Sequence, residues 1–148
     1  MAAVLVITVS CKGTEKVNPK ELFSGGFEAE FSYSLDDMIY SGEMTKDVGG
    51  EYKITMREPK SLENIIFFYL NGETTVSFDG VRRYEAGDNL GKHSVTGLLC
   101  MPLEAAAGSG SESGTAGSGN YALKISGVEL KKITVDEIEI EIKNFIKK

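Results

Sequence analysis

From residue 27 onward the chain alternates apolar and polar side chains with a period of two, which is typical of β-strands that bury one face. In FEAEFSYS, at residues 27–34, the aromatic residues share one face with Ala29, while glutamates and serines form the other. A later run contains IIFFYL and is expected to be covered on both faces. Asn71-Gly72 is the strongest two-residue hairpin signal in the sequence. The pattern therefore predicts a meander of consecutive antiparallel strands. They are expected at residues 27–34, 38–45, 51–57, 62–70 and 74–78.

The second half of the chain combines a candidate helix with further strands. Apolar residues approach helical spacing across residues 94–107, which predicts a helix despite Gly97 and Pro102 within it. Residues 108–120, GSGSESGTAGSGN, have low complexity and predict a flexible, exposed loop. Alternation returns between Tyr121 and Phe145, most clearly in IEIEI, and predicts at least two closing strands.

The amino terminus begins with MAAVLVITV, an apolar stretch that gives way at Cys11 to the polar sequence KGTEKVNPKE. The stretch is far shorter than the ~20 apolar residues of a membrane-spanning helix, so it favours the hydrophobic part of an export signal. VTVSC, with a small residue just before the cysteine, resembles the lipobox of bacterial lipoproteins, whose cysteine carries a diacylglycerol anchor. This resemblance implies a signal peptide at residues 1–10, a lipid on Cys11 and a tether at residues 11–22. The alternative is that Ala2–Val9, rich in Val and Ile, forms the first β-strand of an intracellular protein.

Composition narrows the function classes. The chain has 22 acidic and 16 basic residues and a formal charge of −6, which disfavours nucleic acid as a partner because nucleic-acid binders concentrate Lys and Arg. Cys11 and Cys100 are too few for a disulfide scaffold or a zinc site of four thiolates. The single histidine, His93, lies in a polar stretch without a nucleophile motif nearby, and no P-loop or dinucleotide fingerprint is present. We therefore expect a protein that is not an enzyme and that uses no metal or cofactor.

The order of features in residues 23–148 carries a second resemblance. A strand FEAEFSY leads to a strand containing Ser-Gly, then to YKITM followed by Arg-Glu-Pro, and then to an apolar strand and a hairpin that ends in Asp79-Gly80. Together with the closing ITVDEIEIEIKNF, this order resembles the LolA/LolB-like lipoprotein-carrier superfamily over residues 23–80 and 121–145. The resemblance implies one β-rich α+β domain: a curved antiparallel sheet, shaped as a half-open barrel, with one or two short helices on its concave side.

The two resemblances together imply a bacterial envelope lipoprotein, anchored on the extracytoplasmic face of a membrane, that binds a hydrophobic ligand in a cavity of the curved sheet. The ligand would be a lipid or an acylated protein. Apolar residues of the first three strands are the candidate lining. In a structural, sensor or adhesion module of the cell surface the same residues would be ordinary core, and the sequence leaves both interpretations open. The candidate lining residues are Phe27, Phe31, Tyr33, Tyr40, Met44, Tyr52, Ile54 and Met56.

The Cys11→Ser variant tests the lipid anchor. Buried acyl chains contribute about 0.8 kcal/mol per CH₂, so two chains hold a protein at a membrane and their loss releases it. We expect the variant to leave the membrane fraction while its circular-dichroism spectrum and thermal midpoint stay those of the wild type. Cell fractionation and intact-mass measurement check this. A wild-type protein found in the cytosol with residues 1–10 still attached would contradict the anchor.

Overall fold

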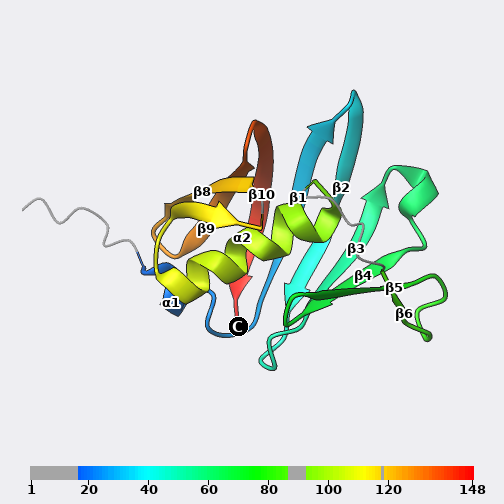
Figure 1. Cartoon of the computed structure of the whole chain (residues 1–148), viewed down its shortest axis with the longest axis horizontal. Helices are drawn as coiled ribbons and strands as arrows, with labels where there is room; N and C mark the ends of the chain where they lie inside the picture. The colour runs from blue at the N-terminus through cyan, green and yellow to red at the C-terminus, as the bar shows by residue number, and fades with distance from the viewer. Residues whose placement is uncertain (1–16, 87–92, 118) are drawn as a thin grey trace, which may run out of the picture.

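The computed structural model describes residues 17–86, 93–117 and 119–148, so Cys11 and every expectation for residues 1–16 lie outside the described chain. Within the described residues the strands form one antiparallel sheet of ten strands that does not close on itself (Figure 1). Three helical segments accompany the sheet: α1 (Pro19–Leu22), the short 3₁₀ helix η1 (Lys60–Leu62) and α2 (Val95–Ser109). The strands are β1 (Phe27–Leu35), β2 (Met38–Lys46), β3 (Tyr52–Glu58), β4 (Ile66–Leu70), β5 (Glu73–Ser77), β6 (Tyr84–Glu85), β7 (Ser113–Ala116), β8 (Gly119–Ser126), β9 (Glu129–Val135) and β10 (Ile138–Lys147).

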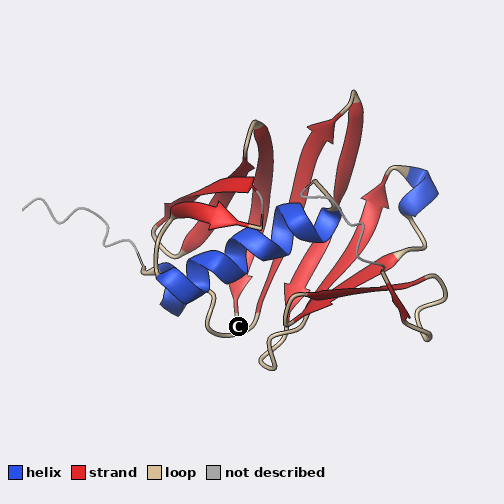
Figure 2. Ribbon diagram, in the orientation of Figure 1, coloured by secondary structure: helices blue, strands red, loops and turns tan. Residues whose placement is uncertain are grey.

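The sheet consists of two meanders that meet in the middle. Its order is β6-β5-β4-β3-β2-β1-β10-β9-β8-β7, so the first and last long strands pair with each other. The predicted meander of five strands from Phe27 onward is confirmed, as is the prediction of at least two closing strands after Tyr121. The chain between the meanders contains α2, which lies diagonally across one face of the curved sheet (Figure 2). The fold is therefore a β-rich α+β fold, as predicted.

The helix predicted at residues 94–107 is confirmed as α2, with its end two residues later. The Ser94 side chain accepts a hydrogen bond from the Gly97 backbone N–H at 3.0 Å, which caps the first turn. Gly110, at φ 74°, ends the helix in the left-handed region that glycine adopts at little cost. Gly97 and Pro102 lower the intrinsic stability of the helix, so packing must hold it in place. Fully buried side chains provide that packing: Leu98, Leu99, Cys100, Leu103 and Ala106.

The loop predicted at residues 108–120 is wrong in part. Its first two residues complete α2, and Ser113–Ala116 form the edge strand β7, which pairs with β8. A strand made of Ser, Gly, Thr and Ala shows no apolar alternation, because it is held by its backbone ladder and exposes most of its side chains. A Cβ on Gly114 would lie 3.2 Å from the Tyr121 ring, so a larger residue at this position would press against the ring.

The tether predicted at residues 11–22 extends too far into the chain. Asn18 caps α1 by accepting a hydrogen bond from the Lys20 backbone N–H at 2.9 Å, and Pro19 begins the helix. Leu22 is fully buried in the core, and Val17 is partly buried against it. The domain therefore includes the chain from Val17 onward, because the polar sequence NPKEL contains a one-turn helix that docks its apolar side.

One strand boundary and the burial of one strand also differ from the prediction. The strand expected from residue 62 begins at Ile66, because residues 60–62 form η1 after Pro59. The apolar run is only partly covered on both faces: Phe68 and Tyr69 are buried, whereas Leu70 is 38% exposed.

Gly42 is the glycine on which the sheet depends most. The register of β2 and β3 shifts between Ser41 and Gly42, and a Cβ on Gly42 would lie 2.1 Å from the Thr55 carbonyl oxygen and 3.1 Å from the Met56 Cα. Both are backbone atoms, so neither can yield by a change of rotamer. Only glycine allows the two strands to approach this closely.

Gly42→Ala should therefore destabilise the domain by about 2 kcal/mol or more, because the strands must separate to admit the methyl group. Gly108→Ala is the matched control, since Gly108 lies in α2 with open space around its Cβ position. The control is expected to be neutral or stabilising by up to about 1 kcal/mol. Urea unfolding of both variants measures the difference. Equal stabilities would show that the close approach at Gly42 does not constrain the sheet.

Candidate functional site

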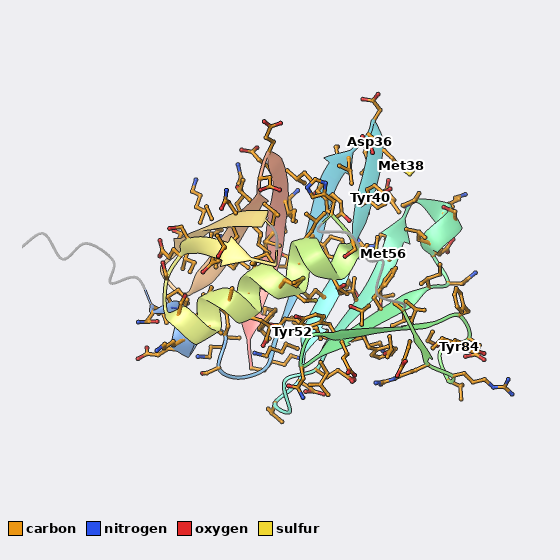
Figure 3. All side chains as sticks on the ribbon, in the orientation of Figure 1. Asp36, Met38, Tyr40, Tyr52, Met56 and Tyr84 are labelled. Atoms are coloured by element: carbon orange, nitrogen blue, oxygen red, sulfur yellow. The ribbon has the colours of Figure 1, made fainter. Side chains whose placement is uncertain are left out.

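The eight predicted lining residues come together on the sheet face that α2 covers. The register places Tyr33 opposite Tyr40, Phe31 opposite Gly42, and Met44 opposite Ile54, so the three strands present one continuous apolar surface. Seven of the eight are buried and belong to the hydrophobic core, while Tyr40 is half-buried at its margin. Figure 3 labels three of them on this surface, with Tyr52 beneath the helix and Tyr40 toward the β1–β2 turn.

Aromatic rings concentrate where β1 and β2 approach their connecting turn. The Tyr33 and Tyr40 rings stack with centroids 5.0 Å apart and an angle of 8° between their planes. Phe31 continues the series, 6.2 Å from Tyr33. Burial raises the pKa of Tyr33, and Tyr40 raises it further, so the hydroxyl stays protonated. These rings form a flat aromatic wall near an end of the covered face.

The other half of the covered face comes from the carboxyl-terminal meander, which the predicted lining omitted. Ile133 on β9 lies opposite Ile140 on β10 at one side and opposite Leu123 on β8 at the other. All three residues are buried. The alternation in residues 121–145 indicates that these side chains share one face of the sheet. It does not show that this face continues the face of the first meander, which follows from the pairing of β1 with β10. Further buried residues from this half are Tyr121, Ile125, Leu130, Val135, Ile138, Ile142 and Phe145.

Lys46, at the end of β2, carries a charge into this apolar interior. Its side chain is only 9% exposed, and its Nζ lies 3.7 Å from a carboxylate oxygen of Glu104 on α2. Nζ also donates a hydrogen bond to the Phe23 carbonyl oxygen at 2.6 Å and lies 5.3 Å from the centroid of the Tyr52 ring. The ammonium group therefore joins β2, α2 and the segment after α1.

The Tyr52 hydroxyl is the one buried side-chain polar atom without a hydrogen-bond partner among the described residues. Burial raises the pKa of Tyr52, and the charge of the nearby Glu104 carboxylate raises it further, although the two groups do not meet hydrogen-bond geometry. Burial likewise raises the pKa of the Cys100 thiol, which keeps it protonated and weakly reactive. The sequence gives no signal that the side chains of Lys46, Tyr52 and Glu104 come together, because Glu104 lies far along the chain from the other two.

The structure places the remaining candidate chemistry outside the covered face. His93 Nε2 lies 3.4 Å from a carboxylate oxygen of Asp136, in the turn between β9 and β10. Residues 17–86, 93–117 and 119–148 hold no group of three or more His, Cys, Asp or Glu side chains arranged to bind a metal ion. None of the helices in this part of the chain is long and apolar enough to cross a membrane.

Comparison with known proteins assigns no family. The chain matches no protein-family model and no curated protein. The resemblance to LolA/LolB-like carriers therefore stays a prediction that rests on the residues and on the order of strands.

Tyr52→Phe tests whether the Tyr52 hydroxyl lacks a partner. Removing a buried hydroxyl without a partner is expected to leave the free energy of unfolding unchanged or to increase it by about 1 kcal/mol. Tyr121→Phe is the matched control, because the Tyr121 hydroxyl donates a hydrogen bond to the Ser111 carbonyl oxygen at 3.0 Å. That variant should lose about 1 kcal/mol. Urea unfolding compares the two, and a clear loss of stability in Tyr52→Phe would contradict the absence of a partner.

Proposed function

We propose that the protein is a non-catalytic binding domain of the bacterial cell envelope, anchored through a lipid on Cys11, that holds a hydrophobic ligand between α2 and the covered face of the sheet. The observation that supports this proposal is the composition of the covered face and of the helix across it. The face is an apolar surface contributed by both meanders, with an aromatic wall at Tyr33 and Tyr40, and the element across it is a helix of low intrinsic stability.

The contacts of α2 support its role as a displaceable cover. Within the described residues, two polar links join its side chains to the sheet: the Thr74–Thr96 hydroxyl hydrogen bond of 2.8 Å and the Lys46–Glu104 ion pair. Otherwise its leucines pack against the sheet without directional bonds. A ligand with an acyl chain offers the same apolar contacts, so it can replace the helix with little net loss of buried area. The ligand then binds only the conformation in which the helix is displaced, so binding shifts the protein toward that conformation.

The finer assignment to LolA/LolB-like carriers belongs to this proposal. An open antiparallel sheet with a helix across one face is the arrangement that the sequence resemblance implies. A lipid anchor at Cys11 would keep the domain at one membrane, which favours receiving or retaining a lipid or an acylated protein over shuttling it.

A second candidate is a structural, sensor or adhesion module whose interior is packed solid. Burial favours this candidate: Phe27, Met44, Tyr52 and Ile54 are each 0% exposed, as are Leu98, Leu99 and Leu103 of α2. In that case the face beneath α2 is core and the binding surface lies elsewhere.

A reversible disulfide between β5 and α2 separates the two candidates. Thr74 and Thr96 are suited to it, because hydroxyl oxygens 2.8 Å apart place the two side chains within reach of a disulfide. In a Cys11→Ser background, Thr74→Cys/Thr96→Cys should bind 11-(dansylamino)undecanoic acid when reduced and at least fivefold more weakly when oxidised. Fluorescence titration measures the affinity, and palmitate should compete.

The reduced protein is the matched control for the oxidised one, since the two differ only by the bond. Equal affinity in both states would refute displacement of α2. No binding in the reduced state or in the Cys11→Ser parent, together with no acyl ligand in native mass spectra of the purified protein, would refute the ligand and favour the second candidate.

A further inference from the structure

The ladder between β1 and β10 stops before either strand does. Phe31 pairs with Ile142 and Ser32 with Glu141, and this register would next bring Tyr33 opposite Ile140 and Ser34 opposite Glu139. Those pairs are not formed, although β1 continues to Leu35 and β10 begins at Ile138. The β1–β2 and β9–β10 hairpins instead diverge, as Figure 1 shows at their turns. The sheet is therefore split between the two hairpins.

Strand parity identifies the backbone groups that face the split. Leu35 pairs with Met38 across a two-residue turn, so the N–H and C=O of Leu35 and of Tyr33 point toward β2. Those of Ser34 consequently point toward β10. By the same parity, Ile138 pairs with Val135, and the N–H and C=O of Glu139 point toward β1. Within the described residues the β1–β10 ladder includes no pair at Ser34 or Glu139, so two strand edges face each other unpaired there.

A cleft of about 570 Å³ occupies the split, within the size range of about 300–1,000 Å³ found for ligand sites. Its two faces differ in chemistry. On the side toward α2 the lining is Tyr33 and Ile138, while Ser32, Ser34, Glu139 and Glu141 project to the other side. Glu137 and Ile39 complete the lining.

The cleft carries a net negative charge. Lys132 lies 3.5 Å from Glu139, and this is the one ion pair within the described residues that involves a cleft glutamate. Glu137 and Glu141 have no such pair there. A partner that enters the cleft gains by bringing positive charge to this side.

We propose that the cleft between the β1–β2 and β9–β10 hairpins binds an extended polypeptide in which basic and apolar residues alternate. The peptide backbone pairs with Ser34 on one side and Glu139 on the other, so that it fills the gap as an added strand. Side chains of an added strand alternate between faces, which sets the pattern: Lys or Arg beside Glu139 and Glu141, and apolar residues beside Tyr33 and Ile138. This proposal is independent of the ligand proposed beneath α2.

The test uses the full chain and fluorescein-labelled hexapeptides. Lys-Val-Lys-Val-Lys-Val should bind in fluorescence anisotropy titrations, whereas Lys-Ser-Lys-Ser-Lys-Ser and Glu-Val-Glu-Val-Glu-Val should bind at least tenfold more weakly. Glu139→Gln/Glu141→Gln should weaken the Lys-Val peptide about fivefold at low salt, in keeping with two partly exposed charge pairs. The control Glu28→Gln/Glu43→Gln removes the same charge from the same sheet face outside the cleft and should leave affinity unchanged.

Amide hydrogen exchange reports the backbone pairing directly. In the free protein the amides of Ser34 and Glu139 should exchange quickly, while those of Ser32 and Glu141 are protected by the ladder. The Lys-Val peptide should slow exchange at Ser34 and Glu139. Three results would each overturn the proposal: protection of both amides without peptide, equal affinity for the Lys-Ser peptide, or equal weakening by the two double variants.

Discussion

Pairing of the first long strand with the last is the interaction on which the rest of the structure depends. β1 and β10 join the two meanders, and without that ladder each meander would expose one apolar face and one more strand edge. Side chains reinforce the ladder on both faces. On the covered face the Phe27 and Phe145 rings lie 5.2 Å apart, and on the other Asn144 donates a hydrogen bond to Glu30 at 2.6 Å. Since these contacts join residues more than a hundred positions apart, the ladder that unites the two meanders forms only when both ends of the domain are present.

The helix α2 depends on this sheet more than the sheet depends on the helix. Its sequence contains glycine and proline, so its stability comes from leucines that pack on a surface built by both meanders. The polar atoms beneath it do not match that packing well. Lys46 donates a hydrogen bond to the Phe23 carbonyl oxygen, but the carboxylate that balances its charge lies 3.7 Å away on a half-exposed glutamate. Among the described residues the Tyr52 hydroxyl has no hydrogen-bond partner. Incompletely satisfied buried polar groups lower the stability of the closed arrangement and reduce the cost of moving the helix.

Local sequence patterns predicted most strands because each strand buries one face and the alternation records which face that is. FEAEFSYS and IEIEI are visible without any knowledge of their neighbours. The edge strand β7 was missed because its side chains are small and exposed, so that no alternation marks it. The one-turn helix α1 was missed because a single turn is too short for a helical period. The covered face was predicted by half. The alternation placed the apolar residues of the first three strands on one face, while β8–β10 and α2 join that face through strand order and tertiary packing.

The open architecture of the sheet is also the basis of the proposed peptide cleft. A sheet that does not close must protect its edges, and here the outer strands β6 and β7 are short. The split between the hairpins is an additional pair of edges inside the sheet, and no helix or strand of the described chain pairs with them. The glutamates of the cleft protect these edges against pairing with a second copy of the chain. In a chain of net charge −6, a second copy brings mostly negative charge to an acidic cleft, so repulsion opposes strand pairing between copies while attraction remains for a basic segment. Charge thus turns an exposed edge, which is usually a site of aggregation, into a surface that selects its partner.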